Sequence, residues 1–298
     1  MTESLREKAI EGYLDRDDGV DWMGLMTYAN SMFDVRDSIK PNLPVFKFDG
    51  EEARRLFNEH FAYLKAHPLI IDPKDFRDNC RLLQKRFIET GVINEPHQIE
   101  MLNTLDWDKL SDEAIALAGK DPSELFERAS SDLGIDAEDG ESQSVLAGLF
   151  INIIRAYLKP VGEAMTGALT RLDEVAVRDK PLLCPTCGSV PAISSVSEVA
   201  GTQSNERKLF CSCCGTVWPF ERVRCAYCGN TNSNKLKYFY ADEDPAHRLH
   251  ACKECGGVMP TVFQNVLKGE LDYDIELVAM GVVQNLYEDQ IKDQDTEA

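Results

Sequence analysis

Cysteine is nearly absent from the part of the chain before residue 184, and the chain contains no long uninterrupted apolar run. Of ten cysteines only Cys80 precedes that position. The most apolar stretch, residues 145–158, is interrupted by Asn152 and Arg155 and is shorter than the ~20 residues that span a bilayer. We therefore expect no membrane partner and interpret this stretch as a core helix. Cys80 stands alone in a helical pattern, which favours a small buried side chain over a nucleophile.

A secretory leader is not expected at the N-terminus. The segment 1–20 is polar and charged, and it lacks the apolar core that such a leader contains. We therefore predict that the protein is cytoplasmic. Thiols stay reduced in the cytoplasm. Closely spaced cysteine pairs in that compartment indicate metal ligands or redox groups before structural disulfides.

Basic residues are few, with 32 Lys and Arg against 51 Asp and Glu and a formal net charge of -19. The imbalance is uneven: residues 1–179 carry 21 basic and 35 acidic residues, whereas residues 180–265 carry 9 and 7. Long-range repulsion would oppose binding to DNA or RNA, so no nucleic-acid partner is expected.

Helical periodicity dominates the first part of the chain. Apolar residues recur at helical spacing in residues 51–67 and 72–90. Ser111 and Asp121 are good helix caps, and residues 142–177 predict two helical stretches with a break or kink at Pro160. Helical spacing returns in residues 271–291.

The fold class expected is α+β with three parts. Residues 1–179 form an acidic, mostly helical domain, residues 180–265 a cysteine-rich module of short strands, and residues 266–298 a C-terminal helix with an acidic tail. The boundary is expected at residues 178–181, where the helical pattern ends and Pro181 follows. Residues 208–210 and 235–240 have strand character.

The cysteine module is an internal repeat. Cys-x2-Cys-x23-Cys-x2-Cys occurs twice, displaced by 41 positions. The two sets, called site 1 and site 2, are Cys184, Cys187, Cys211 and Cys214, and Cys225, Cys228, Cys252 and Cys255. Two residues between cysteines let one tight turn direct two sulfurs at one tetrahedral ion, and a hairpin brings up the second pair. The repeat therefore predicts two four-thiolate metal sites.

Glycine follows the second cysteine of every pair, at positions 188, 215, 229 and 256. Such a turn often requires a positive φ, which glycine tolerates. The duplication favours pairing adjacent turns as grouped above, although interleaved pairing also satisfies the spacing. Cys213 is a surplus thiol: it is a spare ligand, a reactive thiol or, most commonly for such a position, a neighbouring side chain with no role in the site. His247 and His250 precede the last pair and are alternative ligands, but eight cysteines already fill two sites.

Spacing does not distinguish zinc from a single rubredoxin-type iron. We find no phosphate-binding glycine loop, zinc-protease motif or hydrolase elbow, and a closed four-thiolate site lacks the open position of catalytic zinc. The chain is therefore not expected to be an enzyme. Two alternatives remain: a nucleic-acid-binding zinc ribbon, supported by Arg207, Lys208, Arg222 and Arg224, and a rubredoxin-like electron carrier.

The four cysteine turns carry a family resemblance. Residues 183–191 (LCPTCGSVP), 209–218 (LFCSCCGTVW), 224–229 (RCAYCG) and 251–256 (ACKECG) closely resemble the formate dehydrogenase accessory (formation) protein family, FdhE. The resemblance is specific over residues 180–265 and looser elsewhere.

The resemblance implies rubredoxin-like metal turns in which the eight paired cysteines are the ligands, with iron favoured over zinc. It also implies that Cys213 matches an additional cysteine of the family's second motif. The partner implied is the catalytic, molybdopterin-containing subunit of formate dehydrogenase, contacted in the cytoplasm before export. Whether the protein forms a homodimer stays open.

Overall fold

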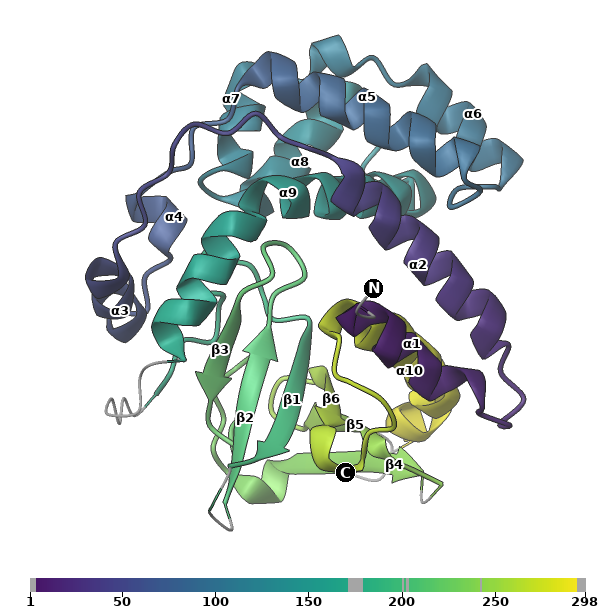
Figure 1. The fold of residues 1–298 in the computed structure, drawn as a ribbon, viewed down its shortest axis with the longest axis vertical. Coiled ribbons are helices and arrows are strands. Elements are labelled where there is room, and N and C mark those ends of the chain that lie inside the picture. The colour runs from purple at the N-terminus through teal and green to yellow at the C-terminus, as the bar shows by residue number, and fades with distance from the viewer. Residues whose placement is uncertain (1–3, 171–178, 200, 202–203, 242, 294–298) are drawn as a thin grey trace.

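The computed structural model describes residues 4–170, 179–199, 201, 204–241 and 243–293, and it has the α+β architecture that the sequence predicts (Figure 1). The helices are α1 Leu5–Leu14, α2 Trp22–Ser38, α3 Gly50–Asn58, α4 Tyr63–Ala66, α5 Pro73–Glu89, α6 Pro96–Thr104, α7 Asp112–Ala118, α8 Pro122–Leu133, α9 Gly140–Leu169 and α10 Tyr273–Asp293. The strands are β1 Ile193–Glu198, β2 Asn205–Phe210, β3 Val217–Phe220, β4 Leu236–Ala241, β5 Asp244–Cys252 and β6 Val258–Phe263. Helices α5 to α8 gather at one end of the molecule, the sheet lies at the other, and α9 runs from these helices to β3.

Side-chain caps begin several helices where the sequence predicts them. Asp72 accepts hydrogen bonds from the N–H groups of Lys74 and Asp75, and Pro73 occupies the first turn of α5. Ser111 caps α7 in the same way through the N–H of Ala114. The side chain of Asp121 makes no capping hydrogen bond at α8; its carboxylate instead pairs with Lys65 at 2.5 Å.

The helix expected over residues 51–67 is two helices, α3 and α4. The chain turns at His60, whose φ is 56°. This turn presents the N–H groups of Tyr63 and Leu64 to the carbonyls of Pro185 and Thr186, at 2.8 and 2.9 Å. A tertiary contact with the first cysteine turn therefore overrides the local periodicity.

Helix α9 is one helix that continues through Pro160, so of the break or kink that the sequence predicted there, the break is absent. The proline removes one N–H donor, but the helix is held on its other side by buried residues such as Ile154, Leu158 and Val161. By length and composition α9 could cross a membrane, yet 61% of its most apolar window is buried inside the protein. Of the boundary expected at residues 178–181, residue 178 lies outside the described residues.

The two cysteine repeats build one six-stranded sheet of order β3-β2-β1-β6-β5-β4. Within each repeat, consecutive strands pair antiparallel, and β1 and β6 join the repeats through a parallel pairing that sets Ser194 opposite Thr261. Strand β3 begins at Val217 and β6 at Val258, which are equivalent positions of the two sequence repeats. The duplication seen in the sequence is therefore a duplication of structure.

The C-terminal helix joins the sheet to the N-terminal helices. Ile275 and Ala279 of α10 pack with Trp22 in one buried cluster, whereas Met280 packs with Leu249 in another. One face of α10 thus contacts α2, and another contacts the sheet.

Candidate metal centres

All four cysteine turns are closed by the same backbone hydrogen bonds. In the first turn the N–H of Gly188 donates to the carbonyl of Cys184 at 2.9 Å, and the N–H of Cys184 donates to the carbonyl of Ser189 at 2.8 Å. The four glycines have φ values of 79° at Gly188, 80° at Gly215, 76° at Gly229 and 71° at Gly256. The conformation that the sequence predicted for these glycines is therefore present in every turn.

Adjacent turns come together in two four-sulfur clusters, site 1 and site 2, whose sulfurs all lie within 4.8 Å of one another. In site 1 the sulfurs of Cys184 and Cys214 are 3.5 Å apart, and in site 2 those of Cys225 and Cys255 are 3.7 Å apart. Four sulfurs at the usual zinc–sulfur distance of ~2.3 Å from one ion would be about 3.8 Å apart. Both clusters fit a tetrahedral ion, and the pairing is the adjacent one.

Site 1 is enclosed by helices. Its four cysteines are at most 1% exposed. The guanidinium of Arg155, on α9, donates to the carbonyl of Cys211 at 3.1 Å, and the N–H of Val217 donates to Thr166 on the same helix at 2.9 Å. Gly162 lets α9 approach so closely that a Cβ at this position would lie 2.1 Å from the carbonyl oxygen of Cys214.

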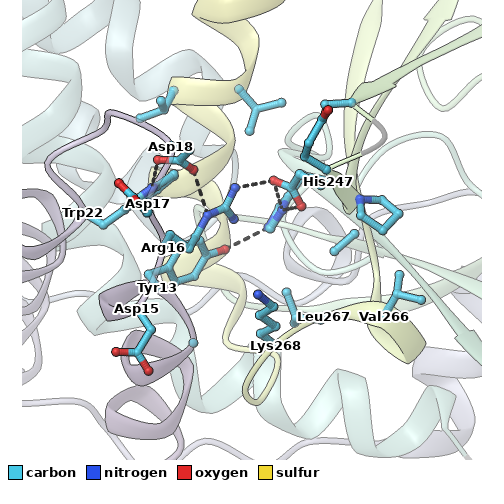
Figure 2. A pocket seen from close by; sticks show the side chains of 18 residues that line it. Tyr13, Asp15, Arg16, Asp17, Asp18, Trp22, His247, Val266, Leu267 and Lys268 are labelled. Atoms are coloured by element: carbon cyan, nitrogen blue, oxygen red, sulfur yellow. Dashed lines mark hydrogen bonds and ion pairs between the residues drawn. The ribbon is translucent and has the colours of Figure 1, made fainter.

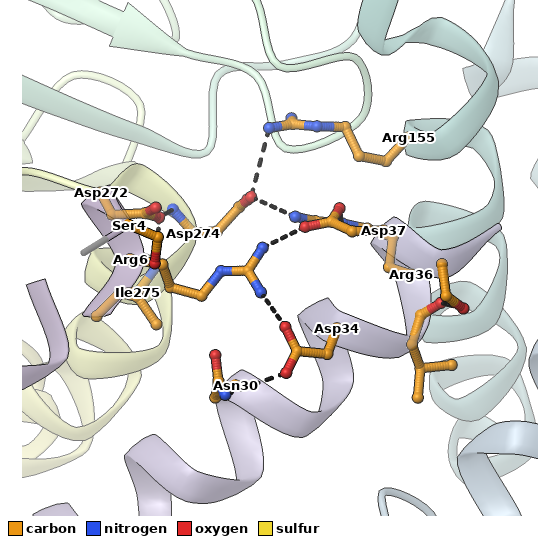
Figure 3. Close-up of polar contacts among 12 residues, drawn as sticks. Ser4, Arg6, Asn30, Asp34, Arg36, Asp37, Arg155, Asp272, Asp274 and Ile275 are labelled. Carbon is orange, nitrogen blue, oxygen red and sulfur yellow. Dashed lines mark hydrogen bonds and ion pairs between the residues drawn. The ribbon is translucent and has the colours of Figure 1, made fainter. Parts of the chain in front are cut away.

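A chain of charged side chains extends from site 1 to the N-terminal helices (Figure 3). Arg155 lies 3.4 Å from Asp274 of α10, which also pairs with Arg36 of α2 at 2.8 Å. Arg36 in turn pairs with Asp37 at 3.0 Å, and Asp37 pairs with Arg6 of α1. In the sequence Arg155 stands out only as an interruption of an apolar run, and a charge inside such a run is the signal that this side chain has a specific partner.

Site 2 lies on the sheet and is partly open. Cys225 and Cys252 are buried, whereas Cys228 and Cys255 are exposed. The N–H groups of Tyr227 and Cys228 donate to the sulfur of Cys225 at 3.4 and 3.5 Å. Although burial acts in the opposite direction, backbone N–H groups of the same turn lower the pKa of Cys252 to about 7. Such donors stabilise thiolates, the form that binds metal.

A buried arginine adjoins site 2 without a carboxylate partner among the described residues. Arg207 is 3% exposed and donates to the carbonyl of Arg224 at 2.9 Å and to Ser194 at 3.3 Å. Burial lowers its pKa to about 10, and with Cys225 and Cys252 it lines one small hollow. An isolated buried charge is costly. Four thiolates around a divalent ion carry a net charge of about -2 and would provide the missing countercharge.

The other candidate ligands lie outside both clusters. Cys213 is buried beside site 1, where the proximity of Cys187, together with burial, raises the pKa of its thiol. The imidazole of His247 hydrogen-bonds to Asp244 and Glu276, and the ring of His250 packs edge-on against Tyr238. Cys80 is buried in the helical core, and burial raises the pKa of its thiol.

The basic residues that suggested a nucleic-acid-binding ribbon are mostly engaged inside the protein. Arg207 and Arg224 are 3% and 8% exposed. Lys208 pairs with Glu206 at 2.6 Å. Arg222 is exposed, and one exposed arginine is not the basic stripe that phosphate binding requires.

The chemistry of the two clusters is that of closed metal sites. Four sulfurs complete a tetrahedral coordination sphere and leave no position for a substrate or water. An ion in either site would cross-link two turns that a whole hairpin separates in the sequence, and it would contribute free energy to folding.

The fold and the clusters define a class: α+β proteins in which a helical layer packs on a duplicated four-cysteine sheet module. Comparisons with known proteins agree. The family model of the FdhE central domain matches residues 183–222. Protein FdhE of Escherichia coli O9:H4 (strain HS) is 37% identical over 97 residues, covering 32% of this chain and 28% of that protein. A FdhE homolog of Stutzerimonas stutzeri is 27% identical over 153 residues, covering 48% and 49%.

The likeness extends over the whole fold. The crystal structure of the FdhE protein from Pseudomonas aeruginosa superposes with a TM-score of 0.50 and 17% sequence identity, covering 96% of this chain and 90% of that one. The chain thus resembles FdhE proteins in the sequence of residues 183–222 and shares the fold of the FdhE crystal structure. The sequence alignments span 28% and 49% of the lengths of the E. coli and S. stutzeri relatives, whereas the fold is shared over 96% of this chain.

Proposed function

We propose that this protein is a non-catalytic accessory factor in the formation of formate dehydrogenase, and that it contacts the catalytic subunit in the cytoplasm. The similarity of residues 183–222 to the FdhE central domain, and of the chain to protein FdhE, supports the link to formate dehydrogenase. The non-catalytic role is supported by the two clusters, in each of which four sulfurs lie close enough together to bind one ion. A metal with four protein ligands lacks the open coordination position of a catalytic metal.

The eight clustered cysteines are proposed to bind two metal ions. The sulfur separations support this role, as does the burial of Arg207 beside site 2 without a carboxylate partner among the described residues. Rubredoxin-type iron is the ion that the family resemblance favours, and zinc is the alternative with the same geometry. When bound, either ion would order the cysteine turns; iron would in addition supply one-electron chemistry.

The proposal is tested by anaerobic affinity purification of the tagged full chain from its own cells, followed by mass spectrometry. The expected result is recovery of a formate dehydrogenase catalytic subunit and two metal ions per chain. A Cys225→Ser/Cys228→Ser variant should lose one ion and recover less of the subunit. Cys80→Ala is the matched control, because Cys80 lies outside both clusters, and it should behave as wild type.

Two outcomes contradict the proposal separately. A preparation that binds two ions but never retains a formate dehydrogenase subunit would refute the proposed partner but not the proposed metal sites. Equal metal content in the wild type and in Cys225→Ser/Cys228→Ser would refute the ligand assignment.

A further inference from the structure

The four cysteine turns differ in what covers them. A Cβ added at Gly188 would lie 3.3 Å from Cε of Lys65, one at Gly215 would lie 2.6 Å from Cζ of Arg155, and one at Gly229 would lie 3.2 Å from a terminal nitrogen of Arg224. A Cβ at Gly256 would meet no described atom within 4 Å. A cationic side chain therefore lies against the glycine of three turns, whereas the glycine of the fourth turn, residues 252–256, faces no described atom; we call this fourth turn the bare turn.

Exposure of the cysteines follows the same division. Every sulfur ligand of site 1 belongs to a residue at most 1% exposed. In site 2, Cys228 and Cys255 are exposed, as are Lys253, Glu254 and Gly256 of the bare turn. Solvent, and any chelating group dissolved in it, can reach site 2 without a movement of the helices.

The turns of site 1 are also anchored more firmly. Backbone hydrogen bonds from Tyr63 and Leu64 hold the first turn, and the buried side chain of Arg155 holds the second. The bare turn of site 2 is tied to its neighbour by the N–H of Lys253, which donates to the carbonyl of Lys235 at 2.8 Å. The half-exposed ion pair of Lys235 with Glu254 adds to this tie, but exposed pairs contribute only about 0–1 kcal/mol.

We propose that the two sites have different kinetic roles: site 2 is an exchangeable metal site that gains and loses its ion through the turn 252–256, and site 1 holds its ion as a permanent part of the fold. The inference rests on the proposed metal binding by the eight cysteines. Exchange involves no redox step. The divalent ion leaves as a complex with an incoming chelating ligand, and the four released thiolates take up protons from water.

The experiment is timed alkylation of the zinc-loaded full chain during a challenge with EDTA. The zinc content is measured first. A chain that binds fewer than two ions would refute the proposed metal sites, and this result is thereby distinguished from failure of the exchange proposal. N-ethylmaleimide then labels thiols as they are released, and peptide mass spectrometry assigns them. A parallel reaction without EDTA corrects for direct attack on the exposed Cys228 and Cys255.

The result expected is labelling of the site 2 cysteines at least tenfold faster than those of site 1, with one of the two zinc ions released in the fast phase. Equal rates, or faster labelling of site 1, would overturn the proposal.

Cys187→Ser and Cys228→Ser, at equivalent positions of the two repeats, provide an independent comparison. Cys228→Ser should keep the slowly exchanging ion and a folded chain, whereas Cys187→Ser should lose the slow phase. Retention of the slow phase by Cys187→Ser, or its loss in Cys228→Ser, would contradict the assignment.

Discussion

A buried charged histidine should make the stability of this protein fall as pH rises above neutrality. The imidazole of His247 is 2.8 Å from Asp244 through Nδ1 and 2.9 Å from Glu276 through Nε2. The hydroxyl of Tyr13 donates to Glu276 at 2.7 Å and lies 2.9 Å from Nε2 of the histidine. This network joins α1, β5 and α10 beside a cavity of about 440 Å³ (Figure 2).

The size of the predicted loss of stability follows from the pKa of His247. Burial by itself favours the neutral ring, but hydrogen bonds to Asp244 and Glu276 outweigh it and raise the pKa from 6.5 to about 9. Hydrogen bonds from His247 and Arg16 likewise hold the pKa of Asp244 at about 2, against the effect of burial. Because the pKa of His247 is higher in the folded state than in the unfolded state, protonation of the ring stabilises the folded state. This contribution is fully present below pH 6.5 and is lost as pH rises through about 9. The shift corresponds to a free energy on the order of 3 kcal/mol.

The assay is urea unfolding of the zinc-loaded protein between pH 6 and 9.5, followed by tryptophan fluorescence. Trp22 reports on this region because its ring centroid lies 4.9 Å from that of Tyr13. Wild type should be more stable than His247→Gln at pH 6, and the difference in unfolding free energy should shrink by roughly 3 kcal/mol up to pH 9.5.

The matched control is His97→Gln. His97 is an exposed histidine that pairs with Glu141 at the surface, where solvent screens the interaction, so the pH dependence of unfolding should be nearly that of wild type. Stability curves of wild type and His247→Gln that run parallel with pH would refute the reasoning, because the ring would then not change its charge in that range.

Two further predictions concern the metal sites. Gly162→Ala should destabilise the protein by roughly 1–3 kcal/mol in urea unfolding, because the new methyl would lie 2.1 Å from the carbonyl oxygen of Cys214. A methyl at Gly167 on the same helix would meet no described atom within 4 Å, so Gly167→Ala should be neutral or stabilising. Arg207→Gln should weaken zinc binding at site 2 by about tenfold in a chelator competition, whereas Lys237→Gln, at an exposed cation of β4 outside the hollow lined by Arg207, should leave the affinity unchanged.

Local sequence patterns predicted the elements whose causes are local. The cap at Asp72 and the helix that follows depend on a few neighbouring residues, and both are present. The four cysteine turns are equally local, since spacing and the glycine at positions such as 188 and 256 determine their backbone. The cysteine repeat indicated a duplicated module, and the six-stranded sheet contains that duplication.

Contacts between distant segments explain where the helices of the structure differ from those predicted from the sequence. The division of residues 51–67 into two helices depends on backbone hydrogen bonds to Pro185 and Thr186, which belong to the cysteine module far along the chain. The continuity of α9 through Pro160 depends on burial of the opposite helix face. Neither cause is visible in a short window of the sequence.

The sequence by itself determined the α+β class and the eight cysteines in two equally spaced repeats, because covalent spacing limits which sulfurs one turn can direct at an ion. Only the tertiary structure decided that adjacent pairs lie together. Tertiary structure alone decided that the two sets are unequal in their surroundings. Site 1 is enclosed by α9 and the charged side chains behind it, whereas Cys228 and Cys255 of site 2 are exposed. The physical reason is that burial depends on which distant elements pack over a turn, and identical repeats can receive different neighbours.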